Sequence, residues 1–276
     1  MEQIIFVVWR ESIEALLVVG ILYAWLRQAE VAGAMRYLWF GVGGGILFAI
    51  ALAAALLGIQ QFLGDVGQEI FMLLMMLVAT VLIVQMVLWM REHGRHLHSH
   101  LKNETQRALE DRTFWSISIL VAIAIGREGS ETVIFLYGMS YAQQTAQDWL
   151  GFAGAVAVAL VLAGFTYYLL QAGRRWMSWK HFFRFTEIML LLLASSLLLS
   201  AVDRMIGLGW VPTGIDPLWD TSAVLDDTSR FGGVVSALTG YRAYPALTDV
   251  VVWLAFWAGI FGLFRLQRRQ QAPVTA

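Results

Sequence analysis

Residues 4–26 read IIFVVWRESIEALLVVGILYAWL, an apolar run that carries Arg10, Glu11 and Glu14 near its middle. A helix needs about 20 mostly apolar residues to cross a hydrocarbon core about 30 Å thick. Six further segments of this kind follow, near 37–59, 70–90, 114–140, 149–171, 184–202 and 248–266. The pattern predicts an all-α integral membrane protein with seven transmembrane helices.

The composition favours the same class. Of the 276 residues 59% are hydrophobic and 14% are charged, whereas charged residues make up about a quarter of a soluble chain. The net charge of −1 provides no basic surface for nucleic acid. The absence of cysteine excludes disulfides and thiolate chemistry. With no phosphate loop and no Ser–His–Asp arrangement either, we expect a protein that is not an enzyme.

Lysines and arginines gather in alternate connections, which indicates an orientation. They lie at 27–36, 91–112, 174–184 and in the C-terminal tail, while the short connections around Asp65 and Asp148 have none. The positive-inside rule places such segments in the cytoplasm. We expect the N-terminus and the 204–247 loop outside, the C-terminus in the cytoplasm, and the chain in the cytoplasmic (inner) membrane.

The sequence also repeats itself. Arg10-Glu11-Ser12-Ile13-Glu14 in the first segment recurs as Arg127-Glu128-Gly129-Ser130-Glu131 in the fourth, and Trp39-Phe40-Gly41 recurs as Trp149-Leu150-Gly151. We predict two three-helix repeats, 1–92 and 113–203, with 248–266 as an additional helix. Three spans separate the copies, so the second repeat is inverted, as in many secondary transporters.

The two motifs put six charges into apolar helices. Each charge at a helix centre costs about 2.5–3.5 kcal/mol, so six unrelieved charges would cost about 15–20 kcal/mol, more than the usual net stability of about 5–15 kcal/mol. Within each motif the Arg and the second Glu share a helix face, being four residues apart. One Arg cannot neutralise two carboxylates, so each motif has a net charge of −1.

A surplus of carboxylates near the midplane favours binding of a hard cation. The charges alone leave the ion open among proton, sodium, manganese, iron and lead, and a transporter of another hard cation is the first alternative. The second alternative is a membrane scaffold in which the Arg–Glu pairs only pin helices together.

Paired Arg-Glu-x-x-Glu motifs in the first and fourth of seven spans resemble the oxidase-dependent iron transporter family, which comprises fungal high-affinity iron permeases and bacterial EfeU-type permeases. Trp89-Met90-Arg91, the stretch 220–225 and Gly240-Tyr241 add to the resemblance. It implies iron import, with iron as the transported substrate and no permanently bound cofactor. The implied iron ligands are Glu11, Glu14, Glu128 and Glu131, and the implied charge partners are Arg10 and Arg127.

The resemblance also implies partners outside the membrane. Bacterial relatives work with a periplasmic metal carrier and a haem peroxidase, and fungal relatives with a multicopper oxidase.

We expect rocking of one repeat against the other to expose the glutamates alternately to each side of the membrane. Uptake should fall at acid pH because protonated carboxylates lose their charge. The sequence leaves ferrous or ferric iron, the energy source and the oligomeric state open.

Three acids outside the motifs are candidates for an accessory metal path: Asp220 in the outer loop, and Glu69 and Glu187 at the predicted starts of two helices. The alternatives are a solvated acidic loop for Asp220 and stabilisation of a helix N-terminus for the two glutamates. Ser12 and Ser130 would add hydroxyl ligands or, as small residues, would serve helix packing.

Four histidines fall in one predicted cytoplasmic segment, namely His93, His96, His98 and His100. Helical spacing would bring two or three of these imidazoles together, where they would accept metal leaving the membrane. The alternative is a basic loop that happens to be rich in histidine, and the family resemblance gives the cluster no support.

Overall fold

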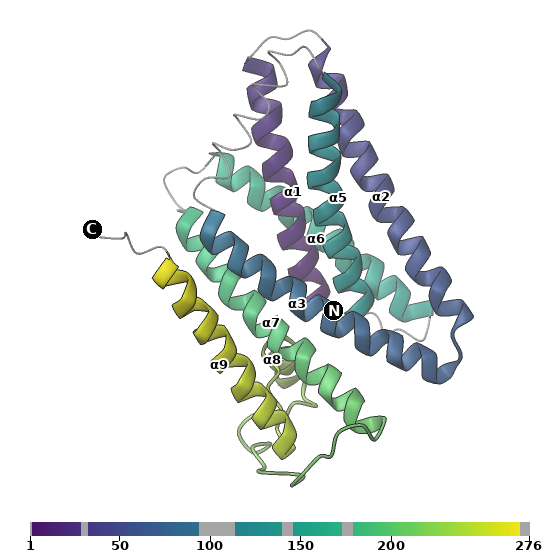
Figure 1. Cartoon of the computed structure of the whole chain (residues 1–276), viewed down its shortest axis with the longest axis vertical. Helices are drawn as coiled ribbons and strands as arrows, with labels where there is room; N and C mark the ends of the chain where they lie inside the picture. The colour runs from purple at the N-terminus through teal and green to yellow at the C-terminus, as the bar shows by residue number, and fades with distance from the viewer. Residues whose placement is uncertain (1, 29–32, 94–113, 140–145, 173–178, 271–276) are drawn as a thin grey trace. The chain divides into compact units, whose positions relative to one another are not determined.

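The structure is a computed structural model that describes residues 2–28, 33–93, 114–139, 146–172 and 179–270. Within these residues the chain is all-helical, with eight helices and no strand (Figure 1). The helices are α1 (Glu2–Gln28), α2 (Ala34–Phe62), α3 (Asp65–His93), α5 (Phe114–Met139), α6 (Ala146–Ala172), α7 (Trp179–Gly207), α8 (Arg230–Thr239) and α9 (Leu247–Gln270).

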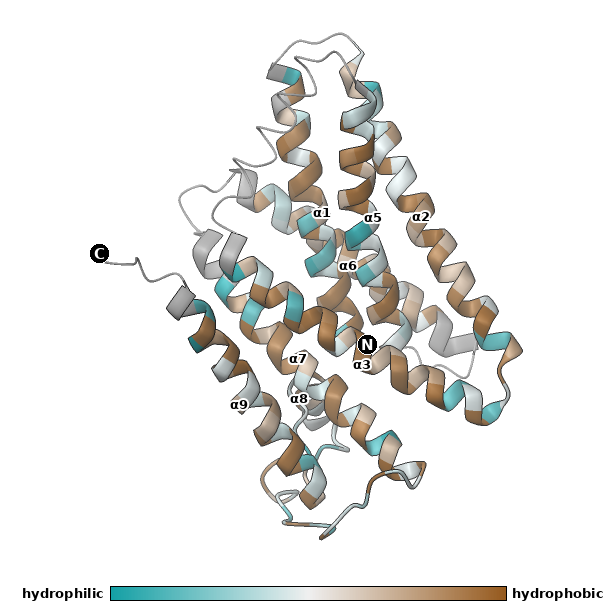
Figure 2. Cartoon of the chain, in the orientation of Figure 1, coloured by the Kyte–Doolittle hydropathy of each residue, from teal (hydrophilic) through white to brown (hydrophobic). Residues whose placement is uncertain are grey.

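Each of the seven predicted apolar segments lies in a helix, apart from residue 140, which falls outside the described residues. Five helices, α2, α3, α6, α7 and α9, are long and apolar enough to cross a membrane. With 27 and 26 residues, α1 and α5 have the length, but the charges of the motifs interrupt them, and Figure 2 shows these interruptions as teal bands near their middles. The fold is that of a multi-pass membrane protein.

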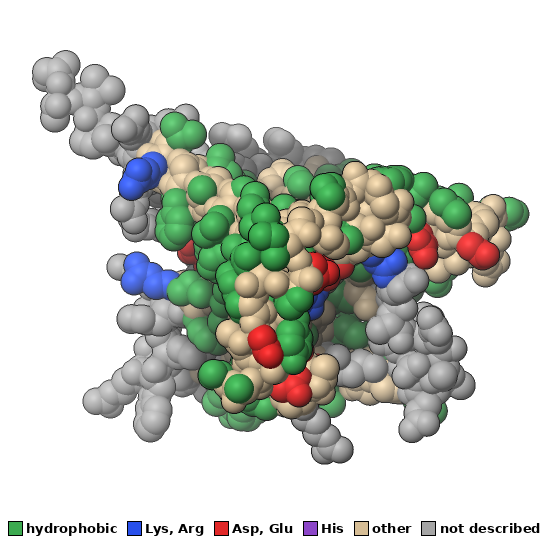
Figure 3. All heavy atoms as spheres, turned by 90° about the horizontal axis from the view of Figure 1, so that it is seen from below, with side chains coloured by type: hydrophobic (Ala, Val, Ile, Leu, Met, Phe, Trp, Pro, Cys, Tyr) green, Lys and Arg blue, Asp and Glu red, His purple; other side chains and the backbone are tan. Residues whose placement is uncertain are grey.

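The described surface is largely apolar. Figure 3 shows hydrophobic side chains over much of the face it presents, with few charged groups among them. Leu47 of α2 and Val161 of α6 are 67% and 72% exposed. Exposed apolar area of this extent is unfavourable in water and is expected where helices face lipid.

The chain divides into two compact units. Unit 1 comprises Met1–Met75 and His93–Arg184, and unit 2 comprises Met76–Glu92 and Phe185–Ala276. Helices α1, α2, α5 and α6 therefore belong to unit 1, which holds both motifs, while α8, α9 and most of α7 belong to unit 2. Helix α3 contributes its first part to unit 1 and its second part to unit 2.

In unit 1, α2 packs against α5 through glycines. A Cβ placed on Gly41 would lie 2.6 Å from the carbonyl oxygen of Ser118, and a Cβ on Gly45 would lie 2.7 Å from the Cβ of Ile125. Contacts under 3.0 Å leave no room for a side chain. Small residues of this kind let two transmembrane helices approach closely, and the approach fixes the position of α5 beside α2.

Helix α1 packs against α6 in a similar way. Ala155 and Ala159 of α6 are buried against Ile4 and Val8 of α1. The indole Nε1 of Trp9 adds a hydrogen bond to the Thr166 hydroxyl at 3.0 Å. Alanines on one face of α6 thus hold α1 as the glycines of α2 hold α5.

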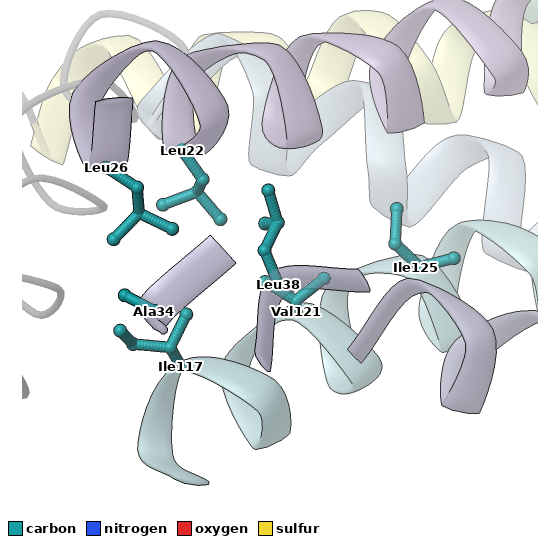
Figure 4. Packing of buried hydrophobic residues seen from close by; sticks show 7 residues of the cluster. All are labelled: Leu22, Leu26, Ala34, Leu38, Ile117, Val121 and Ile125. Atoms are coloured by element: carbon teal, nitrogen blue, oxygen red, sulfur yellow. The ribbon is translucent and has the colours of Figure 1, made fainter. Parts of the chain in front are cut away.

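The ends of three helices meet in an apolar cluster, shown in Figure 4. Its buried members come from the end of α1, the start of α2 and the first half of α5: Leu22, Leu26, Ala34, Leu38, Ile117, Val121 and Ile125. The cluster ties α1 to α5, and these two helices lie side by side in Figure 1.

In unit 2, Arg91 of α3 joins two other helices. Its Nε lies 2.6 Å from a carboxylate oxygen of Glu187 in α7, and its guanidinium carbon lies 3.5 Å from the ring centroid of Phe264 in α9. The Gln267 side chain of α9 also donates to the Leu88 carbonyl at 3.0 Å. These contacts hold α3, α7 and α9 together at one end of the unit.

The region predicted as a plain outer loop is more ordered than expected, because it contains α8. Ser229 caps this helix by accepting a hydrogen bond from the Gly232 amide at 3.0 Å, and Gly240 ends it at φ 76°. The Tyr241 hydroxyl lies 2.7 Å from the Thr221 hydroxyl. The two loop stretches that carry the family resemblance therefore contact each other.

Candidate functional site

The two motifs lie in adjacent helices of unit 1. α1 carries Arg10, Glu11 and Glu14, α5 carries Arg127, Glu128 and Glu131, and α1 packs against α5. Arg10 and Glu11 are each only 1% exposed, and Glu131 is 7% exposed. The structure thus brings together two motifs that lie 117 residues apart in the sequence, with Arg10, Glu11 and Glu131 buried.

Three of the four glutamates form a close group, which we call the carboxylate triad: Glu11, Glu128 and Glu131. One carboxylate oxygen from each lies within 4.8 Å of the others, close enough to hold one metal ion. Within the residues that the structure describes, this is the group of acidic and histidine side chains with metal-binding spacing. Glu14, predicted as a fourth ligand, is not part of it.

The triad also contains buried oxygen atoms without a hydrogen-bond donor. The Oε2 atoms of Glu11, Glu128 and Glu131 are each shielded from solvent and unpartnered. Burying a carboxylate oxygen without a donor is costly. Three such atoms from three neighbouring carboxylates present the donor set that a hard cation prefers.

The two arginines of the motifs are placed differently. Arg10 is buried and binds both glutamates of its own motif, Glu11 at 2.7 Å and Glu14 through its other terminal nitrogen. Arg127 has a 42% exposed side chain, lies 2.9 Å from Glu131, and is 4.0 Å from Glu128. Two guanidiniums facing four carboxylates leave two negative charges without a countercharge.

A cavity of about 270 Å³ adjoins the triad. Glu11 and Glu128 contribute to its wall, and the residues that line the rest come from α1, α2 and α5: Ser12, Ala15, Ile46, Ala49, Ile50, Ala53, Ile125, Gly129, Thr132 and Val133. A space of this size accommodates a cation with several waters.

Two hydroxyl groups on the cavity wall are available to a cation or its water. Ser12 lines the cavity, as a hydroxyl ligand would, whereas Ser130 is not among the lining residues and donates its hydroxyl to the Arg127 carbonyl at 2.7 Å. Thr132 of α5 also lines the cavity, and its hydroxyl donates to the Glu128 carbonyl at 2.8 Å. The sequence analysis missed Thr132, although its position four residues after Glu128 puts both on one helix face.

The three candidates for an accessory path lie outside the triad. Glu69 is exposed, and Glu187 binds Arg91. The prediction that these glutamates begin their helices is wrong, since α3 begins at Asp65 and α7 at Trp179. The macrodipole acts mainly within the first turn, so stabilisation of a helix N-terminus does not explain them.

Asp220 lies in the loop between α7 and α8 and stabilises a turn there. Its Oδ1 accepts hydrogen bonds from the Ser222 hydroxyl at 2.7 Å and the Ser222 amide at 2.9 Å. These bonds hold the pKa of Asp220 below its ordinary value. The carboxylate of Asp220 is therefore an exposed negative charge that also stabilises the turn at Ser222. Of the histidine cluster, His96, His98, His100 and the side chain of His93 lie outside the described residues.

An all-helical membrane chain that holds more carboxylates than arginines beside a cavity has the features of the class of membrane permeases for cations. The chain is a member of the iron permease FTR1 family, whose pattern it matches over residues 1–267. The members of this family are permeases, which are transporters rather than enzymes.

Ferrous iron permeases named EfeU align with three quarters or more of the chain. It is 29% identical over 278 residues to the ferrous iron permease EfeU of Shigella sonnei and to that of Escherichia coli O157:H7, with 96% of each chain covered in both cases. The ferrous iron permease EfeU of Shigella flexneri is 30% identical over 212 residues, which cover 75% of this chain and 88% of that protein. No solved structure is significantly similar to the chain.

Proposed function

We propose that the protein imports iron across the cytoplasmic membrane and that the carboxylate triad binds the iron during transport. The observation that carries this proposal is the set of three buried, unpartnered Oε2 atoms on Glu11, Glu128 and Glu131. Membership of an iron permease family supports iron as the substrate. The names of the relatives favour the ferrous ion for this chain too.

The proposal includes seven transmembrane helices, with α1 and α5 joining the five that are apolar throughout. Their lengths of 27 and 26 residues suffice to cross a bilayer, and pairing and burial offset the cost of their charges. The N-terminus then lies outside and the C-terminus in the cytoplasm, as the distribution of lysines and arginines favours.

We further propose that residues 1–92 and 113–203 are inverted repeats, followed by the outer loop 204–247 and the seventh helix at 248–266. The division into units supports this, because α1, α2, α5 and α6, the first two helices of each repeat, all belong to unit 1. The packing supports it as well. Gly45 of α2 contacts Ile125 of α5, and its counterpart 110 residues later, Ala155 of α6, contacts Val8 of α1.

We also propose an accessory metal path and external partners. Asp220, with Glu69 and Glu187 as further candidates, would raise the local concentration of cations outside the triad. The Arg91 bridge favours a helix-pinning role for Glu187. A periplasmic metal carrier and a haem peroxidase, suggested by the resemblance to bacterial permeases, would supply the iron.

Two alternatives make different predictions. A transporter of another hard cation would accumulate manganese or lead in preference to iron, and proton-coupled transport would acidify the vesicle lumen. A scaffold held by Arg–Glu pairs would lose assembly, rather than uptake alone, when a glutamate is replaced.

The test is radioactive iron uptake by the purified protein in liposomes, with Fe²⁺ kept reduced by ascorbate and with Fe³⁺ citrate in a parallel series. Glu128→Gln should abolish uptake while the protein still elutes as a folded species from gel filtration. Leu47→Ala, on the exposed face of α2, is the matched control and should transport normally. Normal uptake by Glu128→Gln would remove the triad from the proposal.

A further inference from the structure

We infer that Glu14 and Glu131 alternate as the third ligand of the transported cation, while Glu11 and Glu128 bind it on both sides of the cycle. The inference rests on the proposed function and deepens it, because it gives the four glutamates two different roles. Three asymmetries between the repeat-related halves of unit 1 carry it.

The first asymmetry concerns the ligands. The triad takes both glutamates of the second motif but only Glu11 of the first. Glu14 is bound instead by Arg10. The repeat-related residue of Glu14 is Glu131, and it has one oxygen at Arg127 while its Oε2 is unpartnered within the triad.

The second asymmetry concerns the arginines. Arg10 is 1% exposed and spans both glutamates of its motif, whereas Arg127 is 42% exposed and lies within hydrogen-bond distance of Glu131 alone in its motif. We call a motif closed when its arginine binds both of its glutamates. The first motif is in this closed form and the second motif is not.

The third asymmetry concerns the cavity. Ala49 and Ala53 of α2 line it and are partly exposed. Their counterparts 110 residues later, Ala159 and Ala163 of α6, are 0% exposed and pack against α1. The space beside the triad therefore opens along α2, and the equivalent space along α6 is filled.

A chain of two inverted repeats can exchange the conformations of its halves, and this exchange converts one access state into the other. Applied to unit 1, the exchange replaces Glu131 by Glu14 in the triad and leaves Glu11 and Glu128 in place. Arg127 becomes the buried arginine that spans its motif, Arg10 becomes exposed, and the cavity opens along α6.

This exchange explains why each motif needs two glutamates and one arginine. The cation keeps two carboxylates throughout, so it is never released into an apolar interior. The arginine of the closed motif neutralises the glutamate that is not binding, which keeps the number of unpaired charges the same in both states.

Equilibrium binding of Fe²⁺, kept reduced with ascorbate, to the purified full-length protein tests the inference when it is combined with liposome uptake. The variants are the four single Glu→Gln substitutions at 11, 14, 128 and 131 and the double substitution Glu14→Gln/Glu131→Gln. Glu11→Gln and Glu128→Gln should weaken binding about tenfold or more, since a ligand is lost in both states. Gel filtration and the melting temperature establish that each variant is folded.

The singles Glu14→Gln and Glu131→Gln should keep binding within about threefold of the parent, because the state that does not use the replaced residue remains available. Both should nevertheless lose uptake, since transport needs both states. The double variant should bind about tenfold or more weakly than either single.

Equal weakening by all four single substitutions would overturn the alternation and would indicate a fixed site to which all four glutamates contribute. Unchanged binding by Glu11→Gln and Glu128→Gln would instead overturn the proposed function itself. The two failures are therefore distinguishable.

Discussion

Gly45 of α2 lies so close to Ile125 of α5 that a Cβ on the glycine would be 2.7 Å from the Cβ of the isoleucine. The same Cβ would be 2.8 Å from the backbone nitrogen of Gly126. Ile125 itself lines the cavity beside the triad. The separation of α2 and α5 is thus coupled directly to the geometry of the site.

Gly45→Ala should therefore destabilise the protein by about 1–3 kcal/mol, because the added methyl meets backbone that cannot yield without separating the helices. The melting temperature of the protein in detergent measures this. Gly43→Ala is the matched control, since a Cβ there meets no atom within 4 Å. Equal melting temperatures for the two variants would show that the helices are not held by this contact.

Arg10→Gln should be far more damaging than Arg127→Gln. The first leaves Glu11 and Glu14 buried without a countercharge, a loss of about 3–5 kcal/mol for a buried pair, whereas the 42% exposed Arg127 lies within hydrogen-bond distance of Glu131 alone in its motif. The yield of folded protein and its melting temperature compare the two variants. Adding Glu14→Gln to Arg10→Gln should recover part of the loss, and equal damage by the two arginine variants would contradict the burial of Arg10.

The Arg91 contacts predict energetic coupling between α3 and α7. In a double-mutant cycle, Arg91→Ala and Glu187→Gln should lower stability by less together than the sum of their separate effects, with a coupling of about 0.5–3 kcal/mol. Arg265→Ala, at an exposed position of α9, serves as the control partner for Glu187→Gln and should show no coupling. Additive effects of the Arg91 and Glu187 variants would mean that the bridge does not stabilise unit 2.

Asp220 carries a negative charge and also accepts hydrogen bonds from Ser222, and the substitutions Asp220→Asn and Asp220→Ala separate these two roles. Asp220→Asn keeps an acceptor for Ser222 and loses the charge, whereas Asp220→Ala loses both. If the charge feeds the permease, both variants should lower uptake at subsaturating iron, and only Asp220→Ala should expose the loop to limited proteolysis. If the Asp220→Asn variant resists proteolysis and takes up iron normally, Asp220 stabilises the turn and does not contribute to uptake.

The pH dependence of this turn follows from the hydrogen bonds of Ser222. They lower the pKa of Asp220, so their contribution is fully present above the ordinary pKa and is lost as the pH falls through the lowered value. Proteolysis of the loop in the parent should therefore rise only at strongly acid pH. Asp220→Ala should weaken that dependence without removing it, because hydrogen bonds from Thr228 lower the pKa of Asp226 in the same way.

Much of this architecture follows from the sequence. Apolar length placed the seven long helices, because a hydrocarbon core permits few alternatives to a helix of about 20 residues. Two Arg-Glu-x-x-Glu motifs predicted buried charges in α1 and α5. Helix α8 was missed, although Ser229 and Gly240 are residues that typically begin and end a helix.

The differences between the halves of unit 1 were not predictable in this way. The motifs are nearly identical, so nothing in their spacing separates Glu14 from Glu131 or Arg10 from Arg127. Those differences arise from packing, with Ala163 of α6 filling a space that Ala53 of α2 leaves open. Local sequence does not report which of two equivalent packings a conformation adopts.

The most direct test of the central claim is to locate iron in the protein by anomalous scattering at the iron edge, from crystals grown with Fe²⁺ under reducing conditions. We predict one anomalous peak within bonding distance, about 2.0–2.3 Å, of oxygens from both Glu11 and Glu128, with Glu131 or Glu14 as the third ligand. An iron peak elsewhere in the membrane-spanning region, with none between these carboxylates, would contradict the account.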